Sequence, residues 1–156
     1  MIPNLTPYEE TLTFAEDEGV LVDQSYSTKE PATAIHIGED MGVFINENAF
    51  ETDVERRFAF IHEIAHCETR SFFYKRTSKA EGSRIEFKAD KRTVARLVPY
   101  DVYSNTIMDG CLTEHEQAEK WNIPQWYVAT VHYIYETTRW DDVQALKLAV
   151  AQRWDG

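Results

Sequence analysis

The segment FAFIHEIAHCE, residues 58–68, constrains the fold of this chain more than any other stretch. Its apolar residues are spread so that a helix through it is apolar on nearly every side, which is typical of a helix in a protein interior. The same helix carries His62, Glu63 and His66. Burying polar side chains without partners costs several kcal/mol. The segment therefore predicts a buried helix whose polar side chains share a binding partner.

The spacing of the two histidines indicates a metal site. Residues four apart on a helix lie one turn above the other on the same face, so the imidazoles of His62 and His66 can converge on a tetrahedral cation. Glu63 lies about 100° further round the helix, where it can act on a water molecule instead of binding the metal. The alternative is a pair of ordinary core or surface histidines, the usual interpretation of a lone histidine. The full HExxH arrangement, found in zinc peptidases, favours one zinc ion per chain.

A catalytic zinc site has a third protein ligand and an open position. On the next predicted helix Glu86 and Asp90 are four apart, and Val94 and Leu97 continue the same stripe. Carboxylates that interrupt a core-facing stripe indicate that a polar or charged partner lies in the core. We assign Glu86 as the third ligand and Asp90 as the acceptor that orients a ligating histidine through its other ring N–H. Glu81 is the other candidate for the third ligand.

Other roles are considered for Glu86 and for the residues that follow His66. Glu86 could lie on an exposed helix face that opens with a Ser83/Glu86 capping box. Glu68 is no ligand candidate, because it follows the second histidine by two residues and points to the far side of the helix. Thr69 and Phe72 stand where a site of the form HExxHxxGxxH has Gly and His, which excludes that class.

The segments RRFAFIHEIAHCE and EFKADKRTVARLVP resemble the two motifs of the ImmA/IrrE family of metallopeptidases. In that family an HEhxH helix is followed by a helix of the form ExxA[ND]xxAxxLhP, which is matched in register by Glu86, Ala89, Asp90, Leu97 and Pro99. The resemblance implies a gluzincin-like fold, zinc on His62, His66 and Glu86, and Glu63 as general base. It also implies an origin in a prophage or other mobile element and a partner repressor as substrate.

The resemblance covers roughly residues 8 to 136, because GVFINENAFETDVERRF and DGCLTEHEQAEKWNIPQWYV are also similar to segments of the family. Arg92 and Thr93 stand where the family usually has Ala or Phe, a departure that concerns local packing and not the ligands. The predicted helix 141–154 lies beyond the matched segment. It either closes the core or docks a partner, and amphipathic terminal helices usually pack inward.

The expected fold is α+β: a mostly helical, zincin-like domain with a small N-terminal sheet. Helices are predicted at 7–18, 53–69, 83–98, 124–136 and 141–154, with a short one capped by Thr113 and Glu116. Segment 20–22 is expected to be a strand, and 34–37 with 42–46 an antiparallel hairpin. Residues 1–156 are expected to form one metallopeptidase domain. Its parts are the N-terminal helix and sheet in 1–50, the zinc-binding helices in 52–99 and the C-terminal helices in 112–154.

Apolar stripes give the expected buried faces of three helices. They are Tyr8, Leu12 and Ala15; Val54, Phe58, Ile61 and Ala65; and Val143, Leu146, Val150 and Trp154.

Charge and composition limit the partners. The formal net charge of −11 disfavours direct nucleic-acid binding and favours a basic or polar peptide partner. We see neither a signal peptide nor a membrane span, so a cytoplasmic protein is expected. Cys67 and Cys111 are too few for a disulfide framework and are expected to be reduced. The oligomeric state is open.

The predicted reaction is zinc-assisted peptide hydrolysis, in which Glu63 takes the proton of the attacking water and passes it to the leaving amine. An extended substrate could add as a strand along 42–46. The group that stabilises the oxyanion is open, with candidates Tyr74, His115, His132, Tyr133 and the arginines.

Two other functions remain open. The first is a DNA-binding regulator, because residues 115–135 have the outline of a helix-turn-helix. Its second helix is apolar at Trp126, Tyr127, Val128 and Val131, however, where a recognition helix carries polar side chains. The second is a zinc-bound protein that acts by binding its partner, with the zinc site structural.

Overall fold

A computed structural model describes residues 4–25 and 30–154 of the chain. The chain divides into two compact units, one ending at Thr93 and the other beginning at Val94. The division falls inside the long helix α3 (Lys79–Leu97). We describe each unit by itself, and the prediction of a single domain over 1–156 stays a prediction.

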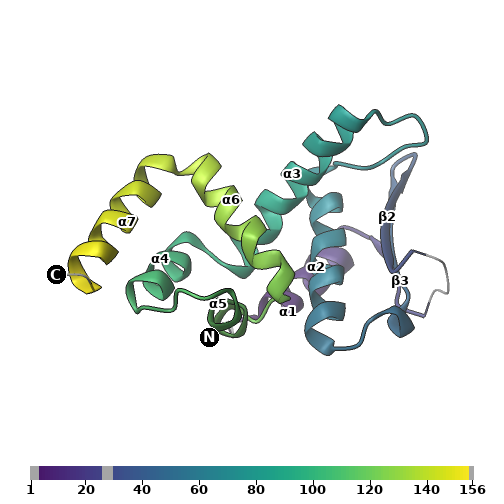
Figure 1. Ribbon diagram of the computed structural model, residues 1–156. Coiled ribbons are helices and arrows are strands. Elements are labelled where there is room, and N and C mark those ends of the chain that lie inside the picture. The colour runs from purple at the N-terminus through teal and green to yellow at the C-terminus, as the bar shows by residue number, and fades with distance from the viewer. Residues whose placement is uncertain (1–3, 26–29, 155–156) are drawn as a thin grey trace. The chain divides into compact units, whose positions relative to one another are not determined.

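The first unit contains a three-stranded sheet (Figure 1). The strands β1 (Leu21–Asp23), β2 (Ala32–Ile37) and β3 (Asp40–Ile45) lie in the order β1-β3-β2. β3 is parallel to β1 and antiparallel to β2, which confirms the predicted hairpin. The hairpin turns at Gly38, whose φ of 63° favours glycine. The polar, proline-containing segment 24–33 predicts a loop; its residues 26–29 lie outside the described residues, and its end at Ala32 and Thr33 belongs to β2 instead.

The sheet corrects the predicted place for an added substrate strand. The prediction of strand addition along 42–46 is wrong, because β3 is the central strand and is paired on both sides. The edge strand of the hairpin is β2. Its alternation puts Ala32 and Ala34 against the core and leaves Ile35 and Ile37 on the outer face, where Ile37 is 71% exposed.

Two helices of this unit begin where the sequence predicts. α1 (Pro7–Asp17) opens with the Thr6/Glu9 capping box, and α2 (Asp53–Thr69) is capped by the side chain of Thr52. The predicted stripe of α1 is wrong at Leu12, which is 37% exposed. Thr11 is buried instead, because its hydroxyl can donate to backbone carbonyl oxygens within the helix. A short 3₁₀ helix, η1 (Glu47–Ala49), precedes α2.

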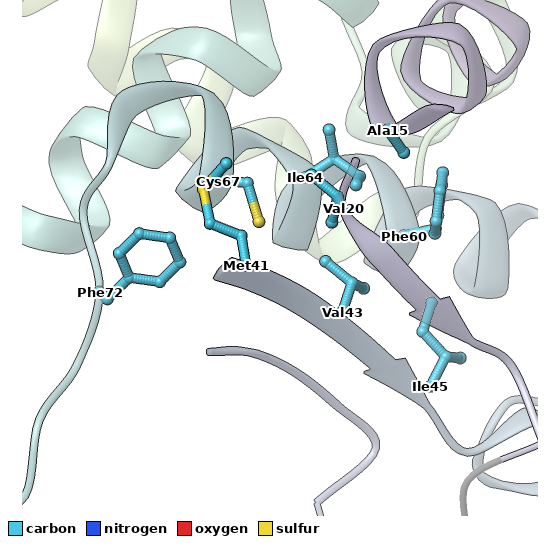
Figure 2. Packing of buried hydrophobic residues seen from close by; sticks show 9 residues of the cluster. All are labelled: Ala15, Val20, Met41, Val43, Ile45, Phe60, Ile64, Cys67 and Phe72. Carbon is cyan, nitrogen blue, oxygen red and sulfur yellow. The ribbon is translucent and has the colours of Figure 1, made fainter. Parts of the chain in front are cut away.

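The core of the first unit fixes one face of α2 against the sheet. Figure 2 shows the side chains of β3 and α2 that meet there, together with residues of α1 and of the segments after α1 and α2. The cluster consists of Ala15, Val20, Met41, Val43, Ile45, Phe60, Ile64, Cys67 and Phe72. Each large apolar side chain buried this way stabilises the fold by roughly 1.5–3 kcal/mol. The sheet therefore holds the HExxH helix rigidly by a face other than the one that carries the histidines.

The helix α3 begins earlier than predicted. The Oγ of Ser78 accepts the backbone N–H of Glu81 at 3.2 Å, and the Ser78 N–H donates to the Glu81 carboxylate at 3.2 Å. This capping box starts the helix at Lys79, so the predicted start at Ser83 is wrong. The alternative Ser83/Glu86 capping box is also excluded, since the Ser83 hydroxyl donates to the Lys79 carbonyl oxygen inside the helix.

The second unit is helical. After Pro99 come α4 (Tyr100–Met108), α5 (Glu114–Trp121), the 3₁₀ helix η2 (Gln125–Tyr127), α6 (Val128–Thr138) and α7 (Trp140–Trp154). The sequence pattern does not predict α4, because Pro99 indicates the end of the preceding helix. A proline also suits the start of the next helix, as it does here.

The helix α7 packs against α4 and α6 within its unit (Figure 1). Val143 and Leu146 of its predicted stripe are buried, but Trp154 is 54% exposed. The inward packing confirms that this helix closes a core. Within residues 4–25 and 30–154, no helix has the length and apolar character needed to cross a lipid bilayer.

Candidate metal centre

The first unit brings His62 and His66 of α2 together with Glu86 of α3. The Glu86 carboxylate lies between the two imidazoles, with Oε2 3.3 Å from Nε2 of His62 and Oε1 3.1 Å from Nε2 of His66. The rings are nearly perpendicular, with centroids 5.0 Å apart. The three side chains predicted as metal ligands therefore converge on one point, with both Nε2 atoms directed toward the same carboxylate.

The position of the proton on His66 follows from its other neighbour. Nδ1 of His66 lies 2.6 Å from the carbonyl oxygen of Ser71. A carbonyl oxygen only accepts hydrogen bonds, so Nδ1 carries the hydrogen. In the neutral ring, Nε2 then has a free lone pair. That lone pair faces a carboxylate of Glu86, which is also an acceptor. A proton or a metal cation between them is needed to make this contact favourable.

The same argument applies to His62. Its Nδ1 lies 3.4 Å from Oγ1 of Thr93 and 3.6 Å from Oδ1 of Asp90. The Thr93 hydroxyl donates to the carbonyl oxygen of Ala89 at 2.8 Å, so its oxygen accepts from the ring. Nδ1 of His62 therefore carries the hydrogen, and Nε2 presents a lone pair toward Glu86.

Thr93 is the orienting residue that sequence reasoning missed. Asp90 was predicted in this role, and it lies close enough to attract the Nδ1–H of His62, but the contact from Thr93 is the shorter one. Thr93 is completely buried. Thr93 follows Asp90 by three residues and so lies on the same face of the helix as Glu86 and Asp90. This position was the sequence feature that could have indicated its role.

The chemistry of these donors fits a divalent cation. There are two groups of residues in each of which the potential ligand atoms all lie within 4.8 Å of one another. The first consists of His62, Glu63 and His66, and the second of His62, Glu86 and Asp90. Two imidazole nitrogens and a carboxylate oxygen form a donor set typical of catalytic zinc. The cluster can therefore hold a metal ion, and Glu81, which caps α3 through Ser78, is not in either group.

The electrostatics favour a cation as well. Burial raises the pKa of Glu86, but the hydrogen bonds to His62 and His66 outweigh burial and lower this pKa to about 2. Burial lowers the pKa of His66, but the bond to Glu86 and the charge of Glu63 outweigh it, and the pKa is raised. The carboxylates thus stabilise positive charge at the point where the imidazoles meet.

Glu63 lies beside this point and contacts the sheet. Burial raises its pKa most, Glu86 adds to the rise, and the charges of His62 and His66 oppose it. The backbone N–H of Ala34 in β2 donates a hydrogen bond to the Glu63 carboxylate. A carboxylate with a raised pKa is closer to the range in which a general base both takes up and releases a proton near neutral pH.

A cleft of about 470 Å³ opens at the centre. It is lined by Glu30, Ala32, Thr33, Ala34, Ile35, Glu63, His66, Phe72, Phe73 and Glu86. One wall is the edge strand β2 and the other comes from α2, α3 and the segment between them. The volume lies in the range of small-molecule and peptide sites.

Of the predicted candidates for an oxyanion-stabilising group, Tyr74 belongs to the first unit and is not among the described residues that line the cleft. His115, His132 and Tyr133 belong to the second unit. In the second unit, His132 is fixed by Tyr103 and Gln117, at 2.8 and 2.7 Å from its ring nitrogens. Burial lowers the pKa of His132, which favours a neutral structural histidine.

An ion pair joins the two helices that carry the candidate ligands. Nε and Nη2 of Arg92 both lie 3.0 Å from Oε2 of Glu68, whose side chain is 9% exposed. Glu68 does point away from the cleft, as its spacing predicts, and it meets α3 there. Arg92 thus joins α3 to α2 through this ion pair.

No protein-family model, curated protein or solved structure matches the chain.

Proposed function

We propose that the protein is a zinc-dependent endopeptidase of the ImmA/IrrE type, with a zincin-like first unit. His62, His66 and Glu86 would hold the zinc ion. The observation that carries the proposal is the Glu86 carboxylate set between two imidazoles whose Nε2 lone pairs are directed toward it. This contact is repulsive for neutral rings and becomes favourable when a cation is bound between the three groups.

Glu63 is the catalytic base in this proposal. A zinc ion would supply Lewis acidity to the scissile carbonyl group. The Glu63 carboxylate takes a proton from the attacking water and later gives it to the leaving amine. The N–H of Ala34 holds this carboxylate in position, and the raised pKa of Glu63 makes it a stronger base for the proton of the water.

The edge of β2 is the place for an extended substrate. The Ala34 N–H is directed to Glu63 and so away from β3. Since backbone groups alternate between the two sides of an antiparallel strand, those of Ala32 and His36 lie on the same side as Ala34. A substrate strand added there lies across the cleft with a peptide bond near Glu63. Amide hydrogen exchange should slow in residues 32–37 when substrate binds, and unchanged exchange there would contradict this placement.

The substrate is proposed to be a partner repressor of a prophage or other mobile element, in the cytoplasm. Support comes from the sequence resemblance and from the net charge of −11, which attracts basic proteins such as DNA-binding repressors. A direct role in DNA binding is less well supported. The helices α5 and α6 have the helix-turn-helix outline, but Val128 and Val131 of α6 are fully buried, and no basic residue lies in 125–131.

The proposal is tested first by metal content. Protein prepared without chelator or added metal should contain about one zinc per chain by elemental analysis. Glu86→Ala should lose it, while Glu81→Ala, the matched change on the same helix, should retain it. Glu63→Gln should keep zinc and lose hydrolysis. Wild-type protein that takes up no zinc even after reconstitution would end the peptidase proposal, and an active Glu63→Gln variant would favour a binding role.

A further inference from the structure

The connection between α2 and α3 places an aromatic side chain beside the candidate metal centre. The ring of Phe73 is 51% exposed although it is large and apolar. It meets the ring of His66 edge-on, with centroids 6.0 Å apart, and it lines the cleft together with Glu63 and Glu86. A half-exposed ring next to polar ligands is a surface that a second apolar group can cover.

The backbone on both sides of Phe73 is held in place. On the N-terminal side, the carbonyl oxygen of Ser71 accepts the Nδ1–H of His66 at 2.6 Å. On the C-terminal side, the backbone N–H of Tyr74 donates to Oγ1 of Thr77 at 2.7 Å. The ring is therefore presented to the cleft by a fixed segment and is ready to receive a ligand group without rearrangement.

Gly82 of α3 makes room for this ring. A Cβ atom at Gly82 would lie 3.1 Å from Cε1 of Phe73, closer than ordinary van der Waals contact. The glycine allows the ring to lie directly against the backbone of α3. Alanine is the better helix former at such a position, so Gly82→Ala should strengthen the helix while it displaces the ring.

The opposite wall of the cleft is the edge of β2. An extended peptide paired with that edge turns alternate side chains toward α2 and α3. We propose that Phe73, backed by Gly82, determines specificity by receiving a large apolar side chain, aromatic above all, from the substrate residue next to the scissile bond. This inference rests on the proposed function, because the zinc ion fixes which substrate residue lies beside the ring.

The test measures binding of two small zinc-directed probes to the zinc-loaded protein by calorimetry. The probes are the hydroxamates of N-acetyl-phenylalanine and N-acetyl-glycine, which share the metal-binding group and differ in the side chain. The phenylalanine probe should bind about tenfold tighter, since an aromatic pair contributes about this factor beyond simple burial. Phe73→Ala should reduce the ratio of the two dissociation constants to near one, through loss of affinity for the phenylalanine probe alone.

Two further variants separate a change at Phe73 from a loss of stability or from the loss of another aromatic side chain in the same segment. Gly82→Ala should lower the ratio while the protein unfolds at the same or a higher denaturant concentration. Tyr74→Ala is the matched control, because Tyr74 is an exposed aromatic on the same segment that bonds His36 and does not line the cleft. It should leave the ratio as in wild type.

The outcomes distinguish this inference from the proposed function. Equal binding of both probes to the wild type would contradict the role of Phe73 and leave the zinc centre intact. An unchanged ratio in Phe73→Ala would do the same. Failure of a zinc-containing protein to bind either probe would show that the metal is closed to ligands and would overturn the subsite. Failure to take up zinc at all would overturn the proposed function and the inference with it.

Discussion

Nδ1 of His66 lies 2.6 Å from the carbonyl oxygen of Ser71, and this contact decides which nitrogen of the ring is available to a metal. The carbonyl is brought there by the end of α2. Arg70 adopts the left-handed conformation, with φ 49°, and the N–H of Ser71 donates back to the carbonyl oxygen of His66 at 3.0 Å. The helix end and the candidate ligand His66 are thus parts of one local structure.

A first prediction concerns the left-handed residue. A non-glycine residue with this φ is strained by roughly 1 kcal/mol. Arg70→Gly should therefore raise the free energy of unfolding by up to about 1 kcal/mol, offset in part by the entropy of the unfolded glycine chain. Urea denaturation measures the change, and zinc affinity should be retained. A clear loss of stability would contradict the assigned conformation at the end of α2.

Thr93 should affect zinc affinity more than stability. Thr93→Val keeps the shape of the buried side chain and removes the oxygen that accepts from Nδ1 of His62. Loss of such an orienting acceptor typically weakens metal binding about 10- to 100-fold. Thr93→Ser keeps the oxygen and serves as control. Competition with a zinc-binding dye gives both affinities, and equal values for the two variants would leave Asp90 as the orienting group.

The ion pair between Glu68 and Arg92 should contribute to stability. Arg92→Met removes a cation that pairs with the nearly buried Glu68 carboxylate, which should cost about 2 kcal/mol. Adding Glu68→Gln should recover part of the loss, because the carboxylate charge that Arg92 stabilised is then gone. Chemical denaturation of the single and double variants measures the coupling. Arg84→Met, an exposed arginine on the same helix, is the control and should change little.

Alkaline pH should unfold the second unit through its buried tyrosines. Burial raises the pKa of Tyr135 to about 12, and its hydroxyl donates to the carbonyl oxygen of Val98. The folded pKa lies above the unfolded value of about 10, so the stability from the neutral phenol is complete below pH 10 and is lost as pH rises through 12. Tyr135→Phe should be about 1 kcal/mol less stable at neutral pH. The difference in the free energy of unfolding between the two proteins should narrow at higher pH. A constant difference up to pH 12 would argue against a raised pKa of Tyr135.

The two thiols should differ in reactivity. Cys67 is 1% exposed, and burial foremost, with Glu63 and Glu68, raises its pKa to about 12. Cys111 is partly exposed. Since the thiolate is the reactive form, a thiol reagent at pH 8 should label Cys111 in the folded protein and reach Cys67 only on unfolding. Mass spectrometry of peptides after timed labelling shows the order, and early labelling of Cys67 would contradict its place in the core.

Features that depend on neighbours along the chain follow from local sequence patterns. The bounds of α2 follow from the Thr52 cap and the apolar run, and the four-residue spacing places His62 and His66 on one face. The interruption of an apolar stripe predicts that Glu86 and Asp90 lie near the histidines, and both are grouped with His62 in the structure. These are local consequences of helical periodicity and capping.

Features that depend on segments far apart in the chain come from the packing of those segments in the folded unit. Which strand lies at the edge is set by pairing of β1 with β3, and this pairing moves the expected substrate position from 42–46 to β2. The carbonyl of Ser71, the hydroxyl of Thr93 and the ring of Phe73 acquire their roles from packing against α2 and α3. Strand order and side-chain packing are non-local, so a single sequence fixes them through the balance of many contacts that no local pattern displays.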